Sequence, residues 1–312
     1  MTATAPARRG PAARTRPIWD EPPTRSGQAA KGVLVGLVLL AVLFPLWVVV
    51  VTSVSPASAI TEAGGLVIVP DGFSTGAYEE LLSGGVVTRS VLVSTGVTVV
   101  GTLFSTVVTL LAAYGLSRPG SFAHRPLLFL VLLTFLFGPG LIPTYLLVSS
   151  LGLLDTYAAL VLPGAVAAFN LVVLRSFFMN LPREVVDSAR IDGASELGVL
   201  TRIVLPLSKG VTAVIALFYG VGYWNAFFNA FLYLNSNDKW PLQMVLRTYV
   251  LQGQSIPGAS AVDSTLDHTG GPVATLAIKM AVIVLAVVPV LVVYPFVQKH
   301  FTKGVIVGAI KG

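Results

Sequence analysis

The sequence of 312 residues contains no cysteine and three histidines. The absence of cysteine excludes disulfides, thiolate metal ligands and thiol nucleophiles together. The histidines His124, His268 and His300 lie far apart in the chain. We therefore predict no catalytic residue and no metal site in this chain.

Charge is also scarce. Charged residues make up 11% of the chain and hydrophobic residues 54%, whereas about a quarter of the residues of a soluble domain are charged. The mean hydropathy is +0.83, and the apolar residues come in long runs. Lipid is therefore the expected solvent for much of the chain. The net charge of +6 is compatible with a nucleic-acid partner, but the positions of the charges argue against one.

Six apolar segments reach the roughly 20 residues that a bilayer-spanning helix needs. They lie at about Val33–Val54, Ser90–Leu116, Leu127–Val148, Tyr157–Phe178, Leu207–Leu232 and Val273–Val297. None of them contains Asp, Glu or His. Arg175 and Lys279 lie within about two turns of a span end, where a long basic side chain can reach water. The predicted fold class is an all-α integral membrane protein with six transmembrane helices.

Lys and Arg residues concentrate on one side of this arrangement. The two termini and the loops after the second and fourth spans hold fifteen of them, and the other side holds three, namely Arg89, Lys239 and Arg247. Because basic loops stay in the cytoplasm, we expect a multi-pass protein of the cell membrane with both termini cytoplasmic. This topology explains the positive charge, so no nucleic-acid partner is expected.

Two domains are predicted. Residues 1–30, rich in Ala, Pro, Arg and Thr, are expected to form a disordered cytoplasmic tail. Residues 31–312 are expected to form the transmembrane domain. The first span runs about 22 residues, longer than the apolar core of a signal peptide. A retained anchor is therefore favoured over cleavage near Ala57–Ala59.

The connection between the fourth and fifth spans, Pro182 to Pro206, predicts a helix–turn–helix elbow on the cytoplasmic face. Pro182 and Glu184 suit the first turn of a helix. Gly193 stands where that helix would end in a left-handed residue. The stretch from Ala194 to Val204 has apolar residues at helical spacing. The segment is too polar to lie in lipid.

This elbow resembles the EAA motif of ABC importer permeases, E-A-A-x3-G-x9-I-x-L-P. The chain has Asp187-Ser188-Ala189, then Gly193 after three residues and Ile203-Val204-Leu205-Pro206 after nine more. Asp replaces Glu, and Ser replaces the first Ala. An ordinary amphipathic loop helix is the alternative, which the complete spacing disfavours. By this resemblance the elbow docks on an ATP-hydrolysing subunit, with contact residues Glu184, Asp187, Ser188, Ala189, Asp192, Gly193, Ala194, Ile203, Leu205 and Pro206.

Other stretches resemble the carbohydrate branch of these permeases. They are Ala113–Arg118, Asp192–Ser195, Lys239–Gln243 and the C-terminal stretch from Tyr294, the last two being similar to an LplC-like group. The resemblance implies a MetI-like, type I permease fold. It implies ABC ATPase subunits that bind ATP and Mg on separate chains, a second related permease subunit, and an extracytoplasmic solute-binding protein. No cofactor is expected on this chain. The expected function is import of an oligosaccharide by alternating access.

Aromatic and amide residues on the fifth span have the composition of a sugar site, where rings meet C–H faces and amides meet hydroxyls. Interfacial aromatics and interhelical hydrogen bonds are the alternative. Tyr145 lies in the third span near Pro139, Gly140 and Pro143, which predict a kinked or unwound segment. The predicted substrate-path residues are Tyr145, Tyr223, Trp224, Asn225, Phe228 and Asn229.

Competing functions fit the sequence less well. A transporter driven by an ion gradient usually keeps a carboxylate or histidine inside the membrane, and an intramembrane hydrolase needs a base beside its nucleophile. The chain also has no G-x4-G-K-[ST] phosphate loop. An ABC permease for a solute other than a sugar, or a membrane scaffold outside the ABC class, remains as the alternative.

Overall fold

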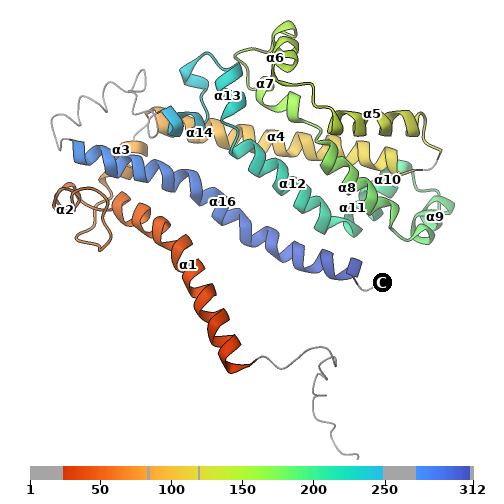
Figure 1. The fold of residues 1–312 in the computed structure, drawn as a ribbon. Helices are drawn as coiled ribbons and strands as arrows, with labels where there is room; N and C mark the ends of the chain where they lie inside the picture. The colour runs from red at the N-terminus through yellow and green to blue at the C-terminus, as the bar shows by residue number, and fades with distance from the viewer. Residues whose placement is uncertain (1–23, 83–84, 119, 249–271, 310–312) are drawn as a thin grey trace, which may run out of the picture. The chain divides into compact units, whose positions relative to one another are not determined.

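The structure is a computed structural model that describes residues 24–82, 85–118, 120–248 and 272–309, and every regular element in these ranges is a helix (Figure 1). The chain divides into two units, Met1–Trp47 and Val48–Gly312. The first unit contains most of α1 (Arg25–Ser53), whose apolar side chains, such as Leu40, are exposed. The second unit contains all the remaining helices.

Helix α1 begins earlier than the sequence predicts. The expected tail ends at residue 30, but α1 starts at Arg25. The Thr24 side chain caps it, because the Gly27 amide donates to Thr24 Oγ1 at 3.2 Å. Residues 1–23, which make up the rest of the expected tail, lie outside the described residues.

Three helices are long and apolar enough to cross a membrane without interruption. They are α1, α4 (Val86–Ser117) and the Leu276–Pro295 part of α16 (Pro272–Ala309). The buried face of α4 is rich in small residues, which let neighbouring backbones approach closely. These helices coincide with the first, second and sixth predicted spans.

None of the other three predicted spans is a single long helix, and three bent helix pairs overlap them. Helix α5 (His124–Leu136) meets α6 (Leu141–Ser150) at 120°, and the segment Ala158–Gly164, which holds α7 (Ala158–Val161), meets α8 (Ala168–Met179) at 51°. Glu196–Leu207 meets α12 (Lys209–Trp224) at 87°. The described part of the chain therefore has three spanning helices, or up to six if each bent pair is one span.

The predicted break in the third span is confirmed, and it is larger than a kink. Residues 137–140 are unwound, and Gly140 has φ 81°, a left-handed value that suits glycine. The fifth span differs as well. We expected it from Leu207 to Leu232, but α12 begins at Lys209 and ends at Trp224, and α13 (Phe228–Tyr233) follows after a break.

The remaining elements of the described residues are short. They are α2 (Ala57–Glu62), α3 (Gly76–Leu82), the 3₁₀ turns η1 (Leu162–Gly164) and η3 (Asn237–Lys239), α9 (Arg183–Ile191), α10 (Glu196–Val199), the π-helix η2 (Leu200–Val204), α11 (Leu205–Leu207) and α14 (Leu242–Leu246).

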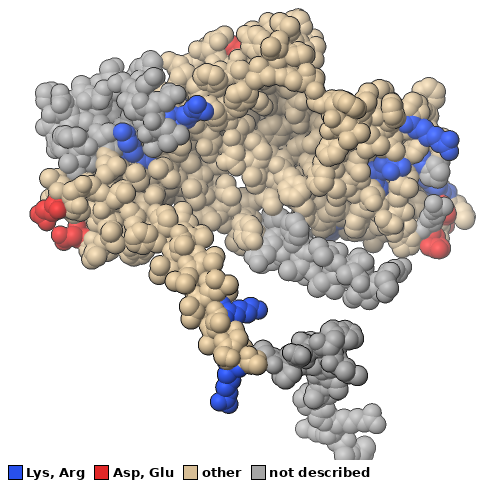
Figure 2. Space-filling model, viewed as in Figure 1, with Lys and Arg blue, Asp and Glu red and all other residues tan. Residues whose placement is uncertain are grey.

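The core of the second unit forms where α12 packs against α4 and α8. A Cβ added at Gly101 of α4 would lie 2.9 Å from the Tyr223 ring, so glycine permits this close approach. Figure 2 shows basic side chains gathered beside α5 and α9 and again beside α13 and α14, with a broad uncharged band between them. An uncharged band bounded by basic residues is the surface expected of a membrane-embedded bundle.

Candidate functional site

The first limb of the elbow is α9, and it ends in a turn that needs glycine. Gly193 has φ 81°. The Ala194 amide donates to the Ala189 carbonyl at 2.9 Å, and the Gly193 amide donates to the Arg190 carbonyl at 3.0 Å. These two bonds form a Schellman motif, which satisfies the last carbonyls of α9. The predicted glycine turn is therefore confirmed.

The second limb runs from α10 through η2 to α11. Ser195 caps it, accepting the Gly198 amide at 3.2 Å. The predicted helix from Ala194 to Val204 thus starts two residues later, at Glu196. Pro206 has no amide hydrogen to continue the regular α-helical ladder, and the π-helix directly precedes α11. The 87° bend into α12 then makes the elbow a projection from the helix bundle.

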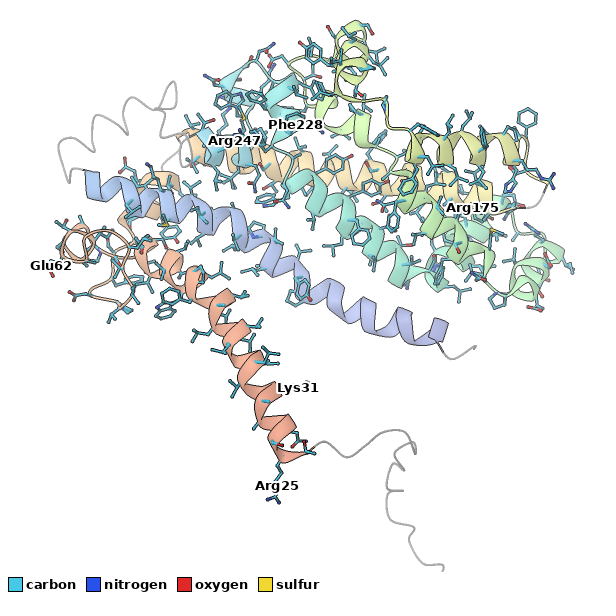
Figure 3. All side chains as sticks on the ribbon, in the orientation of Figure 1. Arg25, Lys31, Glu62, Arg175, Phe228 and Arg247 are labelled. Atoms are coloured by element: carbon cyan, nitrogen blue, oxygen red, sulfur yellow. The ribbon has the colours of Figure 1, made fainter. Side chains whose placement is uncertain are left out.

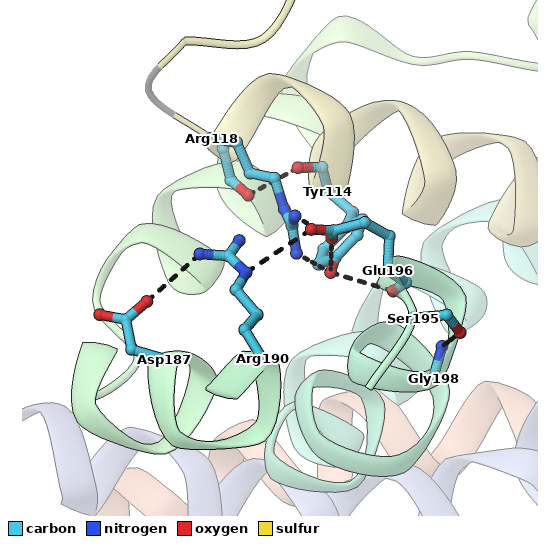
Figure 4. A network of polar contacts seen from close by, with 8 residues as sticks. Tyr114, Arg118, Asp187, Arg190, Ser195, Glu196 and Gly198 are labelled. Carbon is cyan, nitrogen blue, oxygen red and sulfur yellow. Dashed lines mark hydrogen bonds and ion pairs between the residues drawn. The ribbon is translucent and has the colours of Figure 1, made fainter. Parts of the chain in front are cut away.

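A polar network joins the elbow to the end of α4 (Figure 4). The Glu196 carboxylate pairs with the Arg118 guanidinium and, at 3.5 Å, with Arg190 Nε. The Tyr114 hydroxyl donates to Glu196 Oε2 at 3.0 Å, and Arg190 also pairs with Asp187 at 3.2 Å. The Ala113–Arg118 stretch and the elbow, which are far apart in the chain, therefore meet at the Glu196 carboxylate.

Glu196 lies between two like charges. Burial lowers the pKa of Arg118, and the positive charge of Arg190 lowers it further. Without the Glu196 carboxylate the two guanidinium groups would repel each other across the junction. Exposed ion pairs contribute little to stability one at a time, so this network serves mainly to hold α10 and α9 in one orientation on α4.

A cavity of about 290 Å³ lies beneath the elbow. Arg175, labelled in Figure 3, reaches its wall from α8. Its Nε donates to the Leu116 carbonyl at 2.8 Å, and its Nη2 lies 3.4 Å from His124 Nε2. The cavity therefore separates the elbow from the bundle along part of their junction. Space of this kind leaves room for the elbow to move against the helices.

The predicted coupling residues divide into two sets. Ala189, Ile203 and Leu205 are partly buried, and Ala189 and Leu205 pack against the core of the bundle. The exposed set is Glu184, Asp187, Ser188, Asp192, Gly193, Ala194 and Pro206. The structure thus presents most of the predicted contact residues on the outer surface of the elbow.

Sequence reasoning missed two exposed apolar side chains at the tip of the elbow. Ile191 is 87% exposed and Leu197 is 64% exposed, on either side of the Gly193 turn. Large apolar residues in an otherwise polar, exposed segment indicate a protein contact. Both residues stand within four positions of Gly193, the glycine of the motif, and this was a signal available in the sequence. The network residue Glu196 was missed because its partners are distant in the chain.

Two of the predicted substrate-path residues are buried inside the subunit. The Tyr223 hydroxyl lies 2.7 Å from the Ser105 hydroxyl and 3.2 Å from the Val161 carbonyl. Trp224 Nε1 donates to the Ala286 carbonyl at 2.8 Å. Both side chains therefore connect helices of this subunit, which favours the interhelical alternative for them.

The other path residues lie in or near α13, or contact it. Asn225 and Phe228 are exposed and Asn229 is partly buried, all at the break between α12 and α13. Tyr145 stacks on Tyr233 of α13 with ring centroids 6.2 Å apart. The break between α12 and α13 thus brings the exposed members together, and their role as path residues stays a prediction.

A second polar cluster lies at the opposite end of α4, which begins near Arg89 and ends near Arg118. Asp155 accepts the amides of Asn235 and Ser236 at 3.0 and 2.9 Å, and Lys239 Nζ at 2.7 Å. The Lys239 ammonium and the Ser236 donors hold the pKa of Asp155 well below its usual value. Arg89 pairs with the adjacent Asp238 at 3.0 Å. We call the Asp155–Lys239 contact the loop latch.

Within the described residues, no three His, Asp or Glu side chains gather closely enough to hold a metal ion. Each ion pair between described segments joins residues that the sequence assigns to the same side of the membrane. The elbow and the loop latch are thus two separate polar regions, one at each end of α4.

Comparisons with known proteins agree with this geometry. Residues 81–307 match the family model described as the inner membrane component of binding-protein-dependent transport systems. The Bacillus subtilis polygalacturonan/rhamnogalacturonan transport system permease protein YtcP is 49% identical over 79% of this chain and 85% of its own length. The Bacillus subtilis protein LplC is 48% identical over 78% of this chain and 81% of its own length.

A solved structure shares the whole fold. A chain from the crystal structure of a bacterial ABC transporter involved in the import of the acidic polysaccharide alginate has a TM-score of 0.81 and 29% identity, covering 92% of this chain and 100% of that one. The family match covers more than half of this sequence. The chain belongs to the family of inner membrane components of binding-protein-dependent transport systems.

Proposed function

We propose that this chain is one permease subunit of an ABC importer that moves oligosaccharides delivered by an extracytoplasmic binding protein. The observation that carries the proposal is the elbow, a rigid projection with Ile191 and Leu197 exposed on both sides of a glycine turn. Such a projection fits a groove on a partner protein, which we propose to be the ATPase subunit. That partner would bind ATP and Mg, and this chain would bind neither.

In the proposed mechanism the elbow passes motion from the ATPase to the helix bundle. Glu196 fastens α10 to α4 through Arg118, so displacement of the elbow pulls on the end of a long helix. The core between α4 and α12 transmits that displacement along the bundle. A second, related permease subunit would complete the path, and the cavity between the two would open alternately to each side.

The oligosaccharide class rests on the relatives and on the chemistry of the α12–α13 break. YtcP is a permease of a polygalacturonan/rhamnogalacturonan transport system, and the similar solved transporter is involved in alginate import. The exposed Asn225 and Phe228 offer an amide and an aromatic ring, the two groups that a sugar ring needs. We expect Asn225→Ala and Asn229→Ala to alter transport while the complex still assembles; unchanged transport would assign these residues to packing.

The proposed function is tested by affinity purification of the tagged chain from its native membranes, followed by mass spectrometry. The expected result is recovery of an ATPase and a second permease. Ile191→Asp should reduce the recovered ATPase at least tenfold, because a buried carboxylate without a partner costs more than the roughly 1.4 kcal/mol that a tenfold change in affinity requires. Val69→Asp is the matched control, since Val69 is also exposed, at 76%, but lies far from the elbow in the chain. A chain that purifies alone would favour the scaffold alternative.

A further inference from the structure

Three basic residues lie on the side of the chain that the sequence assigns to the exterior, and two of them have acidic partners. Arg89 pairs with Asp238 at 3.0 Å, and Lys239 pairs with Asp155 at 2.7 Å. The third is Arg247, whose side chain is exposed. Within the described ranges, no carboxylate lies at ion-pair distance from Arg247. Among the described residues its charge is therefore not matched by a carboxylate, while Asp263 and Asp267 lie outside these residues.

Arg247 is positioned by an aromatic ring. Its guanidinium carbon lies 4.2 Å from the centroid of Phe227, and the Phe227 ring lies 6.0 Å from that of Phe231. Phe227 belongs to the break between α12 and α13, and Figure 3 shows Arg247 beside Phe228 at this break. A stacked guanidinium keeps its N–H donors in its own plane, where they can bind a carboxylate with two parallel hydrogen bonds.

The same arrangement occurs at the elbow with its anion in place. Arg118 lies 4.2 Å from the centroid of the Tyr114 ring, and its Nη1 pairs with the Glu196 carboxylate. Arg247 lies at the same distance from the Phe227 ring, and no carboxylate in the described ranges pairs with it. The comparison indicates that a carboxylate would complete the arrangement at Arg247, because the stacked Arg118 of the same chain holds a carboxylate at the elbow.

We propose that Arg247, stacked on Phe227, is a specificity-determining residue that binds the carboxylate of an acidic, uronate-containing oligosaccharide at the α12–α13 break. The inference rests on the proposed function and adds to it the charge of the substrate. Asn225 and Phe228 at the same break supply the contacts for a sugar ring. A lipid phosphate could also meet an exposed arginine, but it makes no use of these groups.

The test uses the complete importer, purified with its partners and placed in liposomes. The two probes are a galacturonate oligosaccharide and its methyl-esterified form of equal length, because esterification removes only the charge. Arg247→Gln should lower kcat/KM for the acidic probe about tenfold, as expected for the loss of a charge-assisted contact, and change it less than twofold for the ester. Arg247→Lys, which keeps the charge but loses the paired donors, should lie between.

Arg89→Gln is the matched control, because it removes an exterior arginine that already has a partner. It should leave the ratio of the two kcat/KM values unchanged. An equal fall for both probes with Arg247→Gln, or a fall that occurs only in liposomes containing phosphatidylglycerol, would overturn the inference. Wild-type transport of the ester alone would overturn it while leaving the sugar function standing. Transport of neither probe by an importer with active ATPase would refute the sugar function as well.

Discussion

At the elbow, Glu196 receives two guanidinium groups, and at the opposite end of α4, Asp155 receives an ammonium and the donors of a neighbouring loop. At the loop latch, the charged side chains bind loops of the same subunit to each other. At the elbow, the charged side chains contact the end of α4, and Ile191 and Leu197 are exposed. Similar polar contacts thus produce a closed surface at one end and a surface ready for a partner at the other.

This difference has a physical cause. Asp155 and Lys239 have side chains only 25% and 33% exposed, and the aspartate satisfies several donors at once. Glu196 is 60% exposed and joins the elbow to the end of α4. The Asp155 cluster therefore binds loops to each other, whereas the Glu196 network connects the elbow to a long helix of the bundle. We therefore expect perturbations at the elbow to change coupling and perturbations at the latch to change stability.

The largest effect is expected from Gly193→Val at the elbow turn. A β-branched residue at φ 81° is strained by about 1–3 kcal/mol, so the turn should open and separate the two limbs. Sugar uptake should fall below about a tenth of the wild-type rate, while ATP hydrolysis no longer responds to sugar. Gly193→Asn is the control, because asparagine tolerates left-handed backbone and should keep most of the uptake. Normal uptake by the valine variant would contradict the coupling role.

A smaller effect is expected from Glu196→Gln, which leaves Arg118 and Arg190 close together without a carboxylate. The number of sugars imported per ATP hydrolysed should fall several-fold, while the ATPase still purifies with the chain. Glu196→Asp keeps the charge and should retain more of the coupling. Loss of assembly in place of coupling would show that the network merely stabilises the elbow.

At the latch, Asp155→Asn is expected to lower the unfolding temperature at neutral pH and to leave coupling unchanged. The pKa of Asp155 is lowered in the folded state, so its stabilisation is fully present above the unfolded value near 3.9 and is lost as pH falls toward the lower folded value. The difference in unfolding temperature between wild type and variant should therefore stay constant from about pH 6 to 8 and shrink below about pH 4. Thermal scans in detergent measure it, and a gap independent of pH would contradict the ionic latch.

The smallest effect is expected from Asp238→Asn, which removes the exposed pair with Arg89 beside the latch. Both side chains are more than half exposed, and exposed pairs contribute little. The unfolding temperature should change by less than about 1 °C. A change as large as that of Asp155→Asn would show that the two pairs act as one network.

Local patterns predicted much of this structure. Runs of apolar residues located the three uninterrupted spanning helices, and the glycine and proline positions predicted the elbow turn and the break in the third span. These features depend on neighbouring residues, on hydropathy and on which φ values a residue permits. The starts of α1 and α12 were placed less well, because caps and bends decide the last turn of a helix.

Pairings between distant parts of the chain came only from the tertiary structure. Arg118 meets Glu196, and Arg247 stacks on Phe227, through packing that no local pattern encodes. The same holds for Tyr223, which the aromatic and amide composition of the fifth span suggested for a substrate path but which packing buries against α4. The sequence by itself determined where the chain enters lipid and where it turns, because those depend on local chemistry. The tertiary structure decided which of the described charged residues form ion pairs, because these pairs depend on how distant segments of the chain pack together.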